Sequence, residues 1–200
     1  MPAPAPAPDL WSLGFLRLLR ERAPSGISLE LDAGLTVDPP RADTLLLRRD
    51  DAHLRAGEAG GRVLRRLWPL LGATALVQYH RPSAAAYRWG DLIRLWRQGI
   101  RYQAMHDLTE RAALSLVLVV ASAPAALRDE ILRMSWKLVP LGDGYTRIDN
   151  AVYPTYLVET DQVADAEQDD LLRIFSHHPL STPEACRWLI GWLSSRPSTL

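Results

Sequence analysis

The stretch LSLVLVVAS, residues 114 to 122, constrains the fold more strongly than any other part of the sequence. It is apolar at successive positions and does not alternate between apolar and polar side chains. A strand of this kind buries both of its faces, so other elements must cover it on each side. The sequence therefore predicts that this strand lies at the centre of a mixed sheet with helices on both sides, in an α/β fold.

Periodicity and turn residues predict the other elements of this sheet. A helix is expected from Asp9 to about residue 23, followed by strands over 27–37, 42–49 and 75–80. The polar segment before the third strand is expected to be a loop ending in a short helix. A helix over 90–106 then connects the third strand to the central strand. Beyond the central strand we expect, in order, a helix over 124–135, a hairpin at Gly142-Asp143-Gly144, an edge strand over 153–160 containing Pro154, and helices over 166–176 and 183–195. The last helix opens with Ser181-Thr182-Pro183-Glu184, a capping pattern with proline in the first turn.

The composition favours one cytoplasmic domain. Two hundred residues with 48% hydrophobic content can form one sizeable core, which we place at residues 9–200 after a flexible Pro/Ala tail, MPAPAPAP, at 1–8. Lys+Arg and Asp+Glu balance at 23 each, which excludes a strong overall attraction to polyanions. Cys186 is the one cysteine, so an internal disulfide is excluded. No apolar run approaches the ~20 residues of a membrane helix, and the arginine-rich, lysine-poor composition indicates a GC-rich bacterial genome.

Four polar side chains belong to the third predicted strand and the helix after it. Gln78 and His80 are two residues apart on the strand, so they project from the same face. Gln98 and Tyr102 are four residues apart on the helix, where side chains at that spacing are neighbours. The pattern predicts that all four converge on one small region. Asp91, near the helix start, either adds a charge there or caps the helix.

The element order, with Asp43 opening the second strand and a short polar motif ending the third, resembles the PD-(D/E)XK restriction-endonuclease-like superfamily over residues 9 to 122. In active members, an Asp and the Glu of E-x-K bind a divalent metal, and the Lys supports the attacking water. The resemblance implies a restriction-endonuclease-like core with Asp43 as metal ligand, Gln78 in place of the Glu and His80 in place of the Lys. Gln98-x-x-x-Tyr102 resembles the Q-x-x-x-Y helix motif of the RecB-like branch, which helps orient the site and the nucleic acid.

The two replacements remove charge from the implied metal site. Magnesium in such enzymes is held by anionic oxygens, commonly by more than one carboxylate. Gln78 offers a neutral amide oxygen, and His80 is not the fixed cation that lysine supplies. We therefore expect a nuclease-like protein with an impaired metal site and no cofactor, acting as a binding or scaffolding module in a larger assembly. The alternative is an active Mg²⁺-dependent nuclease on DNA or RNA that uses Asp43 and a displaced carboxylate.

Simpler interpretations of the same residues stay open at this stage. Asp43 could bond its local backbone at a strand entry, and Gln78 with His80 could be a satisfied polar edge. Most of the seven tryptophans are expected in the core, with Trp188 and Trp192, one helical turn apart, as the predicted interface for a protein partner or for self-association. Nucleic acid is a further candidate partner, and a membrane is not expected.

Overall fold

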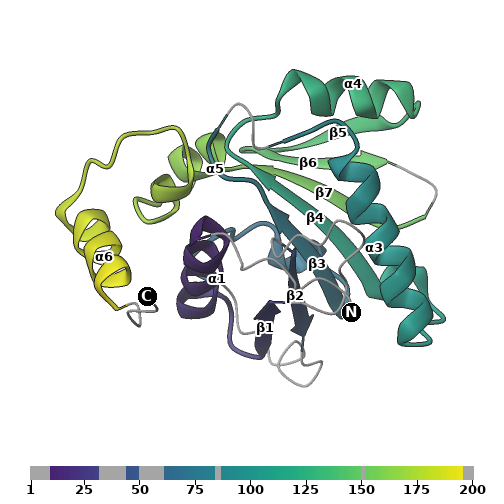
Figure 1. Cartoon of the computed structure of the whole chain (residues 1–200), viewed down its shortest axis with the longest axis horizontal. Helices are drawn as coiled ribbons and strands as arrows, with labels where there is room; N and C mark the ends of the chain where they lie inside the picture. Colours follow the sequence, from purple (N-terminus) through teal and green to yellow (C-terminus); the bar gives the residue numbers. More distant parts are fainter. Residues whose placement is uncertain (1–9, 32–43, 50–60, 84–86, 150–151, 196–200) are drawn as a thin grey trace, which may run out of the picture.

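A seven-stranded mixed sheet in the order β1-β2-β3-β4-β7-β6-β5 forms the centre of the protein (Figure 1). The computed structural model describes residues 10–31, 44–49, 61–83, 87–149 and 152–195. The strands are Ile27–Leu31 (β1), Thr44–Arg49 (β2), Thr74–Tyr79 (β3), Leu114–Val120 (β4), Lys137–Gly142 (β5), Tyr145–Asp149 (β6) and Thr155–Glu159 (β7). The helices are Leu10–Arg22 (α1), Asp91–Met105 (α3), Ala125–Arg133 (α4), Thr160–Ala166 (α5) and Pro183–Ser194 (α6), with 3-10 turns at Trp68–Leu70 (η1), Arg111–Ala113 (η2) and Leu172–Phe175 (η3). The predicted α/β class with a mixed sheet flanked by helices is confirmed.

Strand β4 is the fourth of the seven strands, as its sequence predicts. All of its residues are buried, and it pairs in parallel with β3 on one side and with β7 on the other. Strand β3 pairs antiparallel with β2, which in turn pairs antiparallel with β1. The helix α3 connects the parallel strands β3 and β4, so the carboxyl ends of these two strands lie at the same edge of the sheet.

Each face of the sheet has its own apolar core. On one face, α1, α5, η3 and α6 contribute residues such as Phe15, Val163 and Phe175. On the other face, α3 and α4 contribute residues such as Leu95 and Ile131. Figure 1 shows α3 and α4 on the side of the sheet opposite to α1. This two-sided cover explains why β4 contains no polar face.

Two predicted features of the C-terminal part are wrong. No single helix spans 166–176. Helix α5 ends at Ala166, where the expected helix was to begin, and Gln168 then adopts a left-handed φ of 52°. The Asp169 carboxylate then accepts hydrogen bonds from the Leu171 and Leu172 amides and starts a separate turn. Pro154 does not mark an edge, because it precedes β7, which lies between β4 and β6.

The sheet ends instead at β5, the outer strand of the predicted hairpin. Asp143 and Gly144 connect β5 to β6 with φ values of 52° and 83°, the positive values that a two-residue hairpin loop requires. Pro140 lies within β5, and the pairing register shifts between Pro140 and Gly142. A proline without an amide hydrogen is tolerated at this edge position. Among the described residues, no helix combines the length and apolar character needed to cross a membrane.

Candidate functional site

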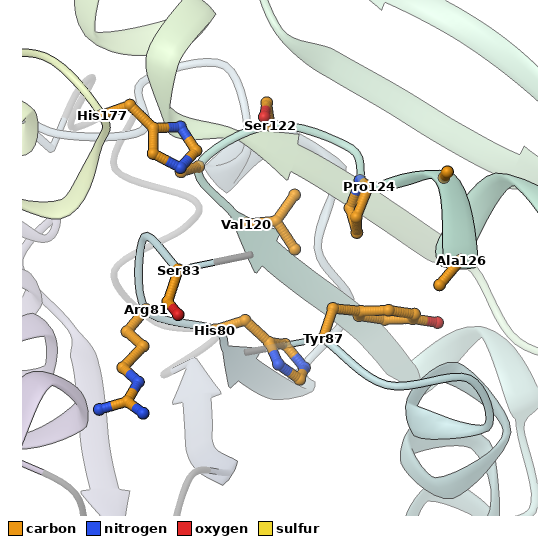
Figure 2. A pocket seen from close by; sticks show the side chains of 11 residues that line it. His80, Arg81, Ser83, Tyr87, Val120, Ser122, Pro124, Ala126 and His177 are labelled. Atoms are coloured by element: carbon orange, nitrogen blue, oxygen red, sulfur yellow. The ribbon is translucent and has the colours of Figure 1, made fainter. Parts of the chain in front are cut away.

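A cavity of about 440 Å³ opens at the carboxyl ends of the parallel strands β3 and β4 (Figure 2). In open α/β sheets, ligands bind beyond the carboxyl ends of strands, and a volume of this size is typical of small-molecule sites. The loops after β3 and β4, the first turn of α4 and the segment after η3 all contribute to its wall. The lining residues are His80, Arg81, Ser83, Tyr87, Val120, Ala121, Ser122, Pro124, Ala125, Ala126 and His177.

His177 is held at the cavity by a carboxylate behind it. Its Nδ1 lies 2.9 Å from Oδ2 of Asp161, and its backbone amide donates to Oδ1 of the same residue at 2.7 Å. These two contacts fix the ring, which Figure 2 shows on the upper side of the cavity near Ser122. Asp161 belongs to α5, so the orientation of His177 depends on the element that follows β7.

His80 lies on the opposite side of the cavity and is 4% exposed. Its Nδ1 is 3.9 Å from Oδ2 of Asp91, and its ring centre is 5.2 Å from that of Tyr87. The Asp91 carboxylate is fully buried and accepts hydrogen bonds from the Arg88 amide at 2.7 Å and from Arg94 at 2.6 Å. Of the two expected roles, Asp91 places a carboxylate beside His80; it does not cap α3, because Gly90 is the N-cap residue and the Asp91 carboxylate instead accepts from the Arg88 amide ahead of the helix.

Glu130 joins α4 to the start of α3 through three hydrogen bonds. Its carboxylate accepts from the Tyr87 hydroxyl at 2.8 Å, the Gly90 amide at 2.7 Å and the Ile93 amide at 3.0 Å. Burial, followed by the bond to Glu130, raises the pKa of Tyr87 far above its ordinary value, so this hydroxyl stays a neutral donor. A carboxylate at a helix N-terminus is favoured by the helix dipole. Glu130 therefore positions Tyr87, one wall of the cavity.

Sequence reasoning did not identify Tyr87, Glu130 or the role of His177 at this site. One signal for Glu130 was available, because it falls between Leu127 and Ile131 on the buried side of α4. An acid at that position of an apolar face must find partners inside the protein.

Gln78 and Gln98 meet at the first residue of β2. Gln78 is 1% exposed and faces Thr44 across the antiparallel pair. The Thr44 hydroxyl donates to Oε1 of Gln98 at 3.1 Å. Within the described part of the chain, Oε1 of Gln78 has no hydrogen-bond partner. An amide oxygen buried in this way costs free energy, so this position is under-satisfied.

The four predicted site residues are all buried, but they do not form one cluster of contacts. His80 lies at the cavity, whereas Gln78 and Gln98 both adjoin Thr44. Tyr102 is 3% exposed and belongs to the apolar core on the α3 face, where its ring lies 4.2 Å from that of His106. Their predicted catalytic roles stay predictions.

The predicted metal ligand Asp43 lies outside the described residues. Among those that are described, no three His, Cys, Asp or Glu side chains are grouped closely enough to hold a metal ion. Gln78 is neutral, and Asp91 is already bonded to Arg94. The described donors therefore do not fit a hard divalent cation, which prefers several anionic oxygens.

Trp188 and Trp192 both contact α1. Trp192 is 7% exposed, and a methyl group on Gly14 would come within 2.6 Å of its ring. Nε1 of Trp188 donates to Oε2 of Glu21 at 2.7 Å, and the guanidinium of Arg17 lies 5.5 Å from the ring centre. Both side chains thus attach α6 to α1 within one chain, and their contact with a second chain stays a prediction.

Protein-family models, curated proteins and solved structures give no match to this chain.

Proposed function

We propose that this chain is a PD-(D/E)XK nuclease-like protein with an impaired metal site, which acts as a binding or scaffolding module in a larger assembly. The element order supports the proposal, because α1, β1, β2, β3, α3 and β4 follow one another as the resemblance implies. The first three strands are antiparallel neighbours, and the fourth is parallel to the third.

The observation that carries the proposal is the state of Gln78. The resemblance puts it in place of a metal-binding glutamate, it is 1% exposed, and its Oε1 has no hydrogen bond among the described residues. A neutral oxygen contributes far less than a carboxylate to the binding of a doubly charged cation. Hydrolysis of phosphodiesters depends mostly on such electrostatic stabilisation, so its loss favours binding without cleavage.

His80, which the resemblance puts in place of the lysine, supports the same conclusion. Its ring is buried and directed towards Asp91, with Nδ1 3.9 Å from the carboxylate. An imidazole in this environment is not a permanent cation beside an attacking water.

A cleavage assay tests the proposal directly. The full chain is incubated with plasmid DNA, single-stranded DNA and RNA in the presence of Mg²⁺ or Mn²⁺, with an active nuclease as positive control. We expect no cleavage above background. Cleavage that Asp43→Ala abolishes would overturn the proposal in favour of the active nuclease.

Rebuilding the missing charge tests whether the site is derived from a metal site. Gln78→Glu places a buried carboxylate there, which should lower the unfolding temperature without metal. Mn²⁺ at about ten times its dissociation constant should restore about 1.4 kcal/mol by mass action. Gln103→Glu on α3 is the matched control. It makes the same chemical change at a glutamine whose amide nitrogen already donates to the Leu108 carbonyl. Equal responses of the two variants to Mn²⁺ would refute a metal-site origin.

A further inference from the structure

We infer that the cavity at the ends of β3 and β4 binds a small organic phosphate, namely a phosphate monoester with an apolar or aromatic body. This inference goes beyond the proposed function and does not depend on a nuclease origin. It is based on the charge of the cavity wall, the support behind that wall and the apolar surface between the polar groups.

The wall of the cavity carries several hydrogen-bond donors and one arginine. Its lining residues include Arg81, Ser83, Ser122 and two histidines, and among the described residues that line it there is no aspartate or glutamate. Arg81 is exposed, and no hydrogen bond of its guanidinium is found within the described part of the chain. In a protein with equal numbers of acidic and basic residues, this local excess of donors favours an anion.

Three described carboxylates contact side chains of the cavity wall. Asp161 bonds His177, Asp91 lies beside His80, and Glu130 bonds Tyr87. The hydrogen bonds from His177 and Tyr87 to these carboxylates orient two lining side chains, which lowers the cost of ordering them when a ligand binds. These lining side chains are therefore held in position before a ligand binds, as the ligand-contacting residues of metal and anion sites are held by the residues around them.

The donors lie around the cavity on separate segments of the chain, and Figure 2 shows the exposed Arg81 guanidinium directed away from His177 and Ser122, so this side chain changes its rotamer to reach a bound ligand. Arg81 and Ser83 follow β3, Ser122 follows β4, and His177 follows η3 (Figure 2). A phosphate monoester has three terminal oxygens that can accept from several directions at once, whereas a carboxylate has two in one plane. The first turn of α4 also lines the cavity, so the positive end of its dipole adds to the same preference.

The rest of the wall is apolar and limits the ligand to a small molecule. Val120, Ala121, Pro124 and Ala126 form this surface together with the ring of Tyr87. A volume of about 440 Å³ accommodates a ring-sized body beside a phosphate group. The apolar surface therefore selects a ligand with an organic body over free inorganic phosphate.

Calorimetric titration of the full chain with phenyl phosphate tests the inference, with phenol, benzoate and inorganic phosphate as comparison ligands. We expect phenyl phosphate to bind at least about tenfold more tightly than each of the other three, since a charge-assisted hydrogen bond changes affinity by about tenfold or more. Arg81→Gln and His177→Gln should each weaken its binding by about tenfold. Both side chains are largely exposed, so neither substitution should unfold the protein.

Arg128→Gln is the matched control, because Arg128 is exposed on α4 and does not line the cavity. The inference is overturned if phenyl phosphate shows no binding at about 10 mM, a concentration on the order of the dissociation constant of a weak ligand. It is also overturned if the Arg81→Gln and Arg128→Gln variants bind phenyl phosphate equally. Equal affinity for benzoate would overturn the phosphate assignment, and competition by an oligonucleotide without a terminal phosphate would overturn the small-molecule assignment. The cleavage and Mn²⁺ assays use neither ligand, so the proposed function can fail while this inference stands.

Discussion

Glu130→Gln tests whether one buried carboxylate fastens α4 to the start of α3. The wild-type carboxylate is fully buried and accepts three hydrogen bonds, two of them on Oε2 and one on Oε1. Glutamine has the same shape, but its amide nitrogen cannot accept. The nitrogen can donate to the Tyr87 oxygen, which reverses that bond, while the Gly90 amide loses its acceptor.

The expected loss follows from these contacts. A buried donor without a partner costs about 1 to 3 kcal/mol, and the removed charge at the helix N-terminus about 0.3 to 1 kcal/mol more. We therefore expect Glu130→Gln to lower the free energy of unfolding by about 2 to 4 kcal/mol. This is a large fraction of the roughly 5 to 15 kcal/mol that stabilises a typical domain.

Urea unfolding monitored by tryptophan fluorescence measures this change. Asp129→Asn is the control, because Asp129 is exposed on the same helix and should alter stability by less than about 0.5 kcal/mol. The dependence of the free energy on urea should be the same for both variants and the wild type. A loss below about 1 kcal/mol for Glu130→Gln would refute the account, because the three bonds could not then be holding the helices together.

Three further predictions concern the other face of the sheet. Gly14→Ala should lower the free energy of unfolding by about 1 to 3 kcal/mol, because the added carbon would lie 2.6 Å from the Trp192 ring. Gly191→Ala should raise it by about 0.5 to 1 kcal/mol, because a carbon added there has no other atom within 4 Å. Urea unfolding of both variants measures the two changes. Burial would raise the pKa of Glu21, but bonds from Arg17 and Trp188 and the Arg17 charge lower it overall. The wild type should therefore be more stable than Glu21→Gln at neutral pH, and this difference should vanish as the pH falls through the lowered pKa. Unfolding measured over a series of acidic pH values tests this, and a difference that stays constant with pH would contradict it. Burial, and then the bond to Glu167, raise the pKa of Tyr145 in the folded protein. Below pH 10, Tyr145→Phe should therefore be less stable than the wild type by roughly 1 kcal/mol. Thermal melts should show this difference shrinking as the pH rises further, because the tyrosine of the unfolded wild type loses its proton first.

Local signals in the sequence predicted the parts of the fold that depend on neighbours along the chain. The apolar run of β4 identified the sheet centre, and Gly144 identified the hairpin. Thr182 was expected at the start of the last helix, where its hydroxyl accepts from the Ala185 amide. The break after α5 could not be predicted, because glutamine at position 168 rarely adopts a left-handed φ.

The candidate site was predictable only where one element determines it. The shared face of Gln78 and His80 was expected from the period of a strand, and both side chains are buried, but His80 lies at the cavity and Gln78 faces Thr44. The bond from Gly90 to Glu130 spans 40 residues, and no local pattern encodes it. His177 reaches the cavity through Asp161, on a different element, so its role depends on tertiary structure.

The position of Pro140 in the outermost strand has a consequence for assembly. A neighbouring molecule that extended the sheet by docking its own strand against β5 would need an unbroken row of main-chain donors and acceptors. The proline and the irregular register beside it interrupt that row. Fibre-like growth from this end is therefore disfavoured, and copies or partners of the protein must associate there through side chains rather than through continued β-pairing.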